Sequence, residues 1–175
     1  TGEGGDVVIP EGVTESGKYA FSWCKNLQSI VIPKSVTKIG SGAFYECKNL
    51  KKIELPKNIT AIESKTFYNC EKLQNVVIPE GVTSIGSNAF FSCKNLKNIV
   101  IPKGVTEIKI WTFDSCEKHQ SVVISEGTKE ISYMAFYGCK NLQSVTLPTS
   151  LEKVDETGFN DCTAIKHFDI ADSKC

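Results

Sequence analysis

Residues 30–52 read IVIPKSVTKIGSGAFYECKNLKK, and residues 76–98 read VVIPEGVTSIGSNAFFSCKNLKN. The similarity between the two stretches extends along the chain, because seven cysteines follow one another at intervals of 23 residues: Cys24, Cys47, Cys70, Cys93, Cys116, Cys139 and Cys162. Phenylalanine keeps the same interval, at Phe21, Phe44, Phe67, Phe90, Phe113, Phe136 and Phe159. All six prolines also fall at one position of the unit. Three residue types that share one period indicate an internal repeat, which determines the whole fold.

Each unit is predicted to begin with a short β-strand. Its first part follows the pattern L-x-x-[VI]-x-[IL]-P, in which Ile30 and Ile32 point inward and Val31 points outward. The proline then ends the strand, where its missing N–H costs no ladder hydrogen bond. The β-branched stretch at residues 36–40 predicts a second short strand, and residues 43–47 predict one helical or 3₁₀ turn.

A single unit of this length cannot bury its apolar face alone, whereas stacked units share one continuous core. The sequence therefore predicts a repeat solenoid with a parallel strand ladder on its concave face. With strands about 4.8 Å apart, the ladder is expected to be about 30 Å long. We expect a leader at residues 1–6, seven repeats in one domain at residues 7–167, and a terminal half-turn at residues 168–175.

The string L-x-x-[VI]-x-I-P-x-x-V-T-x-I-G-x-x-A-F-x-x-C closely resembles the BspA-like, or Treponema-type, leucine-rich repeat over residues 7–167. This resemblance implies a leucine-rich-repeat β-solenoid, horseshoe-like in shape, from a bacterial cell-surface or secreted protein or from the surface of some protozoan parasites. Members of that family look like adhesins that bind matrix proteins or other cells. The resemblance therefore implies a non-catalytic protein-binding or adhesion module. Its expected partner is a host extracellular-matrix or cell-surface protein, or a glycan.

Several positions depart from the repeat pattern, and we expect them to change local geometry without changing the fold. They are Ser16 for isoleucine, Ser125 for proline, Glu63, Lys109, Ser132 and Asp155 for glycine, and Gly158 for alanine or threonine. His119 stands at a leucine position, where we expect a partly exposed edge residue.

Charge and length exclude several classes of protein. Twenty acidic and twenty basic residues give no net charge, so the chain lacks the cationic surplus of a non-specific nucleic-acid binder. Every basic residue is lysine, which leaves no donor for bidentate recognition of phosphate or carboxylate. No stretch approaches the roughly 20 apolar residues that span a bilayer, and no targeting signal is visible at Thr1. The expected extracellular or cell-surface location rests on the resemblance.

The seven cysteines of the repeat invite two readings, disulfide chemistry or core packing. In-register residues of adjacent turns lie about 5 Å apart with parallel Cβ vectors, whereas a disulfide needs converging ones. We therefore predict buried free thiols that behave as small hydrophobes with a weak donor. Cys175 lies outside the series, and pairing with Cys162, pairing with a missing segment and a free thiol all remain open.

The sequence contains no set of residues that is typical of a metal site or of a catalytic site. The close Cys/His pairs are Cys116 with His119 and Cys162 with His167, and neither pair has a third ligand in view. The chain has only two histidines, 48 residues apart on different turns, so we expect no Ser-His-Asp or Cys-His arrangement. We expect no metal, no cofactor and no enzymatic activity.

The outward positions of the first strand form the predicted binding surface. One column contains Val31, Glu54, Val77, Val100, Val123, Thr146 and Asp169. The neighbouring column contains Ser29, Lys52, Asn75, Asn98, Ser121, Ser144 and His167. We expect partner contacts along the valine stripe Val77–Val100–Val123, because an exposed apolar strip commonly marks an interface. The alternative is that valine simply fits a pleated ladder.

An aromatic column at Tyr45, Tyr68, Phe91 and Tyr137 follows the core phenylalanines. Such a column either covers the core between turns or binds a sugar or a protein. For the chain as a whole, the alternative to a binding module is a passive spacer or display segment of a larger surface protein. We expect it to be a monomer.

Overall fold

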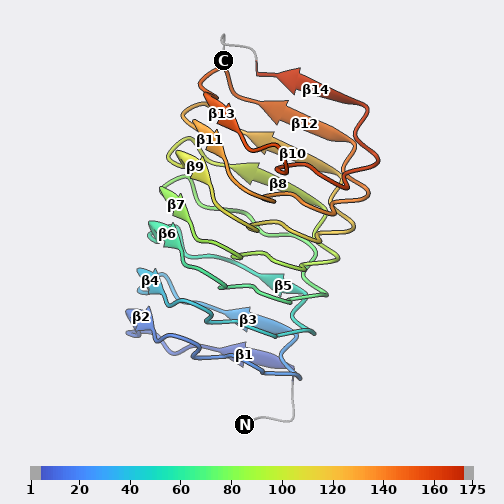
Figure 1. Ribbon diagram of the computed structural model, residues 1–175. Coiled ribbons are helices and arrows are strands. Elements are labelled where there is room, and N and C mark those ends of the chain that lie inside the picture. Colours follow the sequence, from blue (N-terminus) through green and yellow to red (C-terminus); the bar gives the residue numbers. More distant parts are fainter. Residues whose placement is uncertain (1–4, 172–175) are drawn as a thin grey trace.

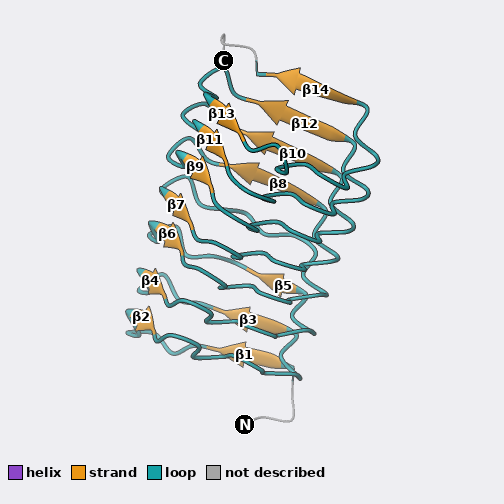
Figure 2. Ribbon diagram, viewed as in Figure 1, coloured by secondary structure: helices purple, strands orange, loops and turns teal. Residues whose placement is uncertain are grey.

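The computed structural model describes residues 5–171 and shows a single solenoid of short strands and turns (Figure 1). Successive units stack along one axis, with the N-terminal and C-terminal units at opposite ends (Figure 1). Figure 2 shows that the strands gather in two ladders, joined by turns and loops. The predicted solenoid with a parallel ladder is therefore confirmed.

The first ladder is built by the first strand of each unit. It contains β1 (Asp6–Val8), β3 (Ser29–Val31), β5 (Lys52–Ile53), β8 (Asn98–Ile101), β10 (Ser121–Ile124), β12 (Ser144–Leu147) and β14 (His167–Ile170). All pairings are parallel and join residues 23 apart, as Ile30 with Ile53 and Ile99 with Val122. Ile30 is 3% exposed and Val31 is 57% exposed, so the period-two alternation sorts core from surface as predicted. The boundary expected after residue 167 falls inside β14.

The first ladder is interrupted once. Strands β1, β3 and β5 form one sheet, and β8, β10, β12 and β14 form another. Residues 76–78, between the two sheets, belong to no strand. A single bridge from Lys52 to Asn75 joins this unit to β5.

The second ladder contains the short strands that the β-branched segments predict. They are β2 (Glu15–Ser16), β4 (Lys38–Ile39), β6 (Ala61–Ile62), β7 (Ser84–Ile85), β9 (Glu107–Ile108), β11 (Glu130–Ile131) and β13 (Lys153–Val154). Each strand has two residues, and its isoleucine is buried in β4, β6, β7, β9 and β11. The two ladders thus enclose one apolar core.

The segment expected to form a helical or 3₁₀ turn instead forms consecutive β-turns, and no helix occurs in residues 5–171. Ala43 N–H donates to Gly40 O at 3.1 Å, and Cys47 N–H donates to Phe44 O at 3.1 Å. The third residue of each turn has a positive φ, 63° at Gly42 and 60° at Glu46, as type II turns require. Between these bonds, Phe44 N–H donates to Thr66 O of the next unit at 2.9 Å. A helix would keep those donors within the unit, so stacking decides against it.

A continuous column of phenylalanine rings fills the core. The rings of Phe44, Phe67, Phe90 and Phe113 lie nearly parallel, with centroids 5.2–5.5 Å apart. The column extends to Phe21 at one end and to Phe136 and Phe159 at the other. Because each interior ring stacks on the rings of the two adjacent units, removing one ring leaves a cavity and takes away a stacking partner from both neighbours.

The cysteine thiols donate hydrogen bonds to backbone carbonyls of the preceding unit. Cys70 Sγ donates to Phe44 O at 3.2 Å, and Cys93 Sγ donates to Phe67 O at 3.1 Å. The same contact recurs at Cys47, Cys116, Cys139 and Cys162. The prediction of buried free thiols that act as weak donors is confirmed for the interior of the series.

Two predictions about single residues are wrong. Cys24 is an exposed free thiol, because no unit stacks on its outer side within the described residues. His119 is fully buried instead of partly exposed, and its ring lies 6.0 Å from that of Phe113. The leucine position faces the core in every interior unit, so a polar replacement there cannot reach solvent. Cys175 lies outside the described residues.

Candidate functional site

The predicted valine column lies on the outer face of the first ladder, and its side chains are exposed. Val77 is 82% exposed, Val100 is 54% exposed and Val123 is 39% exposed. Val100 and Val123 are direct neighbours in the register of β8 and β10. Val31 is also exposed, and so is Val8, which belongs to the same column but was not part of the predicted site. The 23-residue interval alone could have added Val8.

The predicted polar column runs beside the valines. Asn98 and Ser121 are paired in register, and Ser121 Oγ donates to Asn98 Oδ1 at 2.8 Å. Lys52 and Asn75 are joined by the single bridge across the interruption. The side chains of Asn98 and Ser121 thus bond to each other, and the neighbouring Val100 and Val123 stay exposed on the same face.

The interruption of the ladder creates a hollow that the sequence did not reveal. It has a volume of about 750 Å³ and is lined by residues 52–55, 57, 75 and 77–81. The predicted residues Lys52, Glu54, Asn75 and Val77 all belong to it. Leu55, Ile78 and Pro79 add apolar surface that sequence reasoning missed. A second hollow of about 210 Å³ joins Val31 and Glu54. The structure therefore brings together the N-terminal half of the predicted site around an apolar depression.

The charges around the larger hollow are balanced. Lys52 and Lys57 face it together with Glu54 and Glu80, and no ion pair among the described residues joins these four side chains. An apolar floor with both signs of charge at its rim is typical of a protein-interaction surface.

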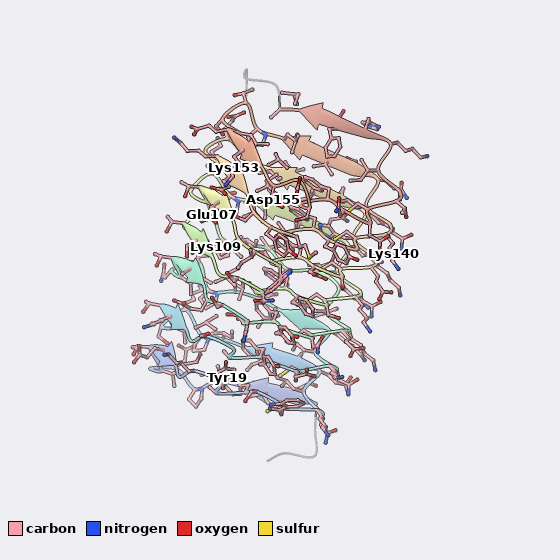
Figure 3. All side chains as sticks on the ribbon, viewed as in Figure 1. Tyr19, Glu107, Lys109, Lys140, Lys153 and Asp155 are labelled. Carbon is pink, nitrogen blue, oxygen red and sulfur yellow. The ribbon has the colours of Figure 1, made fainter. Side chains whose placement is uncertain are left out.

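The second ladder carries charged side chains that pair with one another. Lys153 Nζ lies 2.7 Å from Glu130 Oε1, and Ser132 Oγ donates to Glu107 Oε1 at 2.8 Å. Figure 3 places Glu107, Lys109, Lys153 and Asp155 along this side of the solenoid. Exposed pairs of this kind contribute little to stability. Exposed apolar side chains also occur beside this ladder, at Ile110, Trp111 and Val154. A hollow of about 410 Å³ lies next to β4 and β6, smaller than the 750 Å³ hollow of the first ladder, and it is lined by residues 37, 38, 58, 60, 61 and 63.

The comparison with protein families agrees with the repeat geometry. The BspA type leucine rich repeat region matches residues 5–120 and 108–174, with six copies. The chain belongs to the BspA-type leucine-rich repeat family. The resemblance inferred from the 23-residue motif is thereby confirmed. A search of curated protein sequences finds no match.

Solved structures of bacterial leucine-rich repeat proteins share this architecture. The chain is 32% identical to the Treponema pallidum leucine-rich repeat protein, with a TM-score of 0.85, and the match covers 94% of this chain and 79% of that one. It is 28% identical to a leucine-rich cell-surface protein of Faecalibacterium prausnitzii, with a TM-score of 0.68. That match covers 97% of this chain but 60% of the other, so the chain spans about three fifths of that relative. A Bacteroides ovatus leucine-rich repeat protein, 23% identical with a TM-score of 0.62 and covering 94% and 63% of the two chains, shares the fold.

The aromatic column of this BspA-type solenoid is only partly continuous. Tyr45, Tyr68 and Phe91 stack with centroids 4.7 Å apart and nearly parallel planes. The next unit carries Asp114 at this position, and the unit after it carries Tyr137. The predicted column of four rings is therefore a stack of three, followed by a carboxylate and then a separate ring. The 23-residue interval could have revealed Asp114, which sequence reasoning passed over.

Neither a cluster of possible metal ligands nor a long apolar helix occurs in residues 5–171. Within residues 5–171, no three side chains of His, Cys, Asp or Glu converge as metal ligands would. The same part of the chain contains no apolar helix of membrane-spanning length.

Burial governs the ionisation of the few enclosed groups. It raises the pKa of Cys47 to about 12, and a hydrogen bond with the backbone of Cys24 offsets part of this rise. It also raises the pKa of Cys70, Cys93 and Cys116 above the usual range of a thiol. A thiol that stays protonated is a poor nucleophile, so the interior cysteines are suited to packing.

Proposed function

We propose that this chain is a non-catalytic protein-binding module that engages its partner through the first ladder. The observation that supports the proposal is the exposed valine column, Val31, Val77, Val100 and Val123, together with the apolar hollow beside Val77. Exposed apolar surface of this kind is costly in water and commonly marks an interface. The alternative, that valine is present for its strand propensity alone, does not account for Val77, which belongs to no strand.

The hollow provides the anchor point of the proposed interface. Binding energy concentrates where a bulky apolar side chain of the partner enters a depression and is shielded from water by a polar rim. Ile53, Leu55, Ile78 and Pro79 provide the apolar lining, and Lys52 and Glu54 belong to the rim. Further along the ladder, Asn98 and Ser121 offer hydrogen-bonding groups beside Val100 and Val123. The partner that fits is a protein with an apolar anchor and polar surroundings.

The biological setting of the proposal comes from the family. BspA-type repeats and a cell-surface relative support a role in adhesion at a cell surface or in a secreted protein. The proposed partners are host extracellular-matrix or cell-surface proteins, or glycans, and the proposed binding unit is a monomer. Catalysis is not part of the proposal, since leucine-rich repeat solenoids generally provide a binding scaffold.

The test is a binding screen of the purified chain against immobilised matrix proteins, glycans and host cells. The double variant Val77→Lys/Val100→Lys places two charges on the valine column, and we expect it to weaken binding by about tenfold or more. The matched control Thr60→Lys/Thr106→Lys adds the same two charges at exposed positions beside the second ladder and should bind as the parent does.

Two outcomes would contradict the proposal. Unchanged binding by the valine double variant would exclude the first ladder as the interface. Insensitivity to charged substitutions on every face would favour the alternative, a passive spacer or display segment of a larger protein. Circular dichroism of each variant confirms that the solenoid remains folded.

A further inference from the structure

We propose that Asp114, with Phe91 and Tyr137 on either side, binds a guanidinium group supplied by an arginine side chain of a partner protein. This position lies in the turn segments, apart from the valine column, so the proposal does not rest on the function proposed for the first ladder. Between Tyr45 and Tyr137, Asp114 is the one position of the aromatic column that carries no ring. This position is called the gap, or the step, of the column.

The register of the solenoid fixes the spacing around Asp114. Rings at this position stack 4.7 Å apart when adjacent units both carry them, as Tyr68 and Phe91 do. Phe91 and Tyr137 belong to units that are two steps apart, so their planes are expected to be separated by roughly 9–10 Å at strand spacing. A flat group placed midway would contact both rings at an ordinary stacking distance. Phe91 and Tyr137 are both partly exposed, so they can be approached from solvent.

The carboxylate of Asp114 favours binding of a cation at this step. Asp114 is only 6% exposed, and burial raises its pKa, opposed in part by the hydrogen bond from Ser115. That bond, 2.6 Å from Ser115 Oγ to Asp114 Oδ1, is its only side-chain hydrogen bond among the described residues. No lysine in residues 5–171 forms an ion pair with it. The other oxygen, Oδ2, has no protein donor and is not among the fully enclosed atoms of the described residues. A poorly solvated carboxylate with one free oxygen gains most from a positively charged donor.

Planarity and charge together select guanidinium. An ammonium group is compact and strongly hydrated, whereas guanidinium is flat, stacks on aromatic faces and presents forked N–H donors to a carboxylate. The chain contains no arginine, so it cannot supply this group from its own sequence. An arginine side chain of a partner protein supplies both the planar group and the charge.

The experiment is a titration of the ¹⁵N-labelled chain with N-acetylarginine amide and, separately, with N-acetyllysine amide, followed by NMR. We expect saturable shifts of the amides around residues 91, 114 and 137 with the arginine probe, and about tenfold weaker binding of the lysine probe. Asp114→Asn removes the charge with little change of shape, and Asp114→Phe fills the step with a ring. Both variants should lose the arginine-dependent shifts.

Stability provides a second readout that is independent of any ligand. Asp114→Phe should raise the unfolding temperature, because it restores the stack and removes a buried carboxylate. Glu117→Gln, which neutralises an exposed carboxylate of the same unit, is the matched control and should change neither binding nor unfolding temperature. The valine double variant should bind the arginine probe as the parent does, which separates this proposal from that for the first ladder.

The proposal is overturned by any of three results. Equal affinity for the two probes would show that charge alone is recognised. Persistent arginine shifts in Asp114→Phe would place the probe elsewhere. A lower unfolding temperature of Asp114→Phe would show that the rings of Phe91 and Tyr137 are not in line with this step.

Discussion

Replacing His119 by leucine is expected to stabilise the protein and to remove part of its pH dependence. His119 is fully buried at a position where the adjacent units carry Leu96 and Leu142, which are buried as well. Neither ring nitrogen, Nδ1 nor Nε2, has a hydrogen-bond partner. Burial lowers the pKa of His119 to about 4. The backbone of Leu96 offsets a small part of this decrease, but its carbonyl does not meet the geometry of a hydrogen bond to either ring nitrogen. The folded protein therefore holds a neutral, unsatisfied imidazole in its core.

The magnitude follows from two contributions. At pH 7, an unsatisfied buried polar group costs about 1–3 kcal/mol, so His119→Leu should gain about 2 kcal/mol. For a chain of this size, that corresponds to roughly 4–8 °C in unfolding temperature. As the pH falls, His119 is protonated near pH 6.5 in the unfolded state but only near pH 4 in the folded state. The unfolded state binds more protons in this window, so the wild type loses about 3 kcal/mol as pH falls from about 6.5 to 4.

The assay is urea unfolding of wild type and variant at several pH values between 4 and 7. The carboxylates titrate in both proteins, so the difference between the two curves isolates His119. We expect this difference to grow as pH falls. His167→Gln, at an exposed position of β14, serves as the control and should follow the wild type. A variant that is less stable than wild type, or a difference that does not change with pH, would refute the reasoning that His119 is buried and unsatisfied.

Three further predictions concern the turns, the thiols and the ring column. Lys65→Gly should gain about 0.5–1 kcal/mol in urea unfolding, because Lys65 has a φ of 58° and glycine removes its strain at a smaller entropic cost; a loss of stability would contradict this. Iodoacetamide at pH 8 should modify Cys24 in the folded protein and Cys93 only after unfolding, as mass spectrometry would show. Phe90→Ala should cost about 3–5 kcal/mol, and a cost below 1 kcal/mol would argue against the stacked core.

The repeat period accounts for how much of the fold could be predicted. A residue such as Ile30 faces the core because the alternation within its strand and the interval to Ile53 both require it. The same reasoning placed Val100 and Val123 side by side on the surface. It failed in the turns, where Phe44 N–H bonds to the next unit and the chain forms β-turns in place of a helical one. The composition of a five-residue segment does not reveal which unit receives its hydrogen bonds.

The candidate site was predicted in its columns but not in its shape. Lys52, Glu54, Asn75 and Val77 were expected to be members of a continuous concave ladder, and they line a hollow at its interruption. The sequence around Val77 matches the strand pattern of the other units, so nothing in the local pattern indicates that residues 76–78 are unpaired. Pairing depends on the relative position of two units along the whole turn, which a one-dimensional pattern does not contain.

The 23-residue interval of cysteine and phenylalanine by itself determined the solenoid, its register and the side of the chain that faces the core, because identical units can bury their apolar faces only by stacking in register. The tertiary structure decided the features that depend on the units above and below. It buried His119 without a hydrogen-bond partner, directed Phe44 N–H to Thr66 O of the next unit, and left Cys24 exposed where no unit among residues 5–171 covers it. Each of these outcomes depends on contacts between units, and such a contact contributes energy only when both partners are in place.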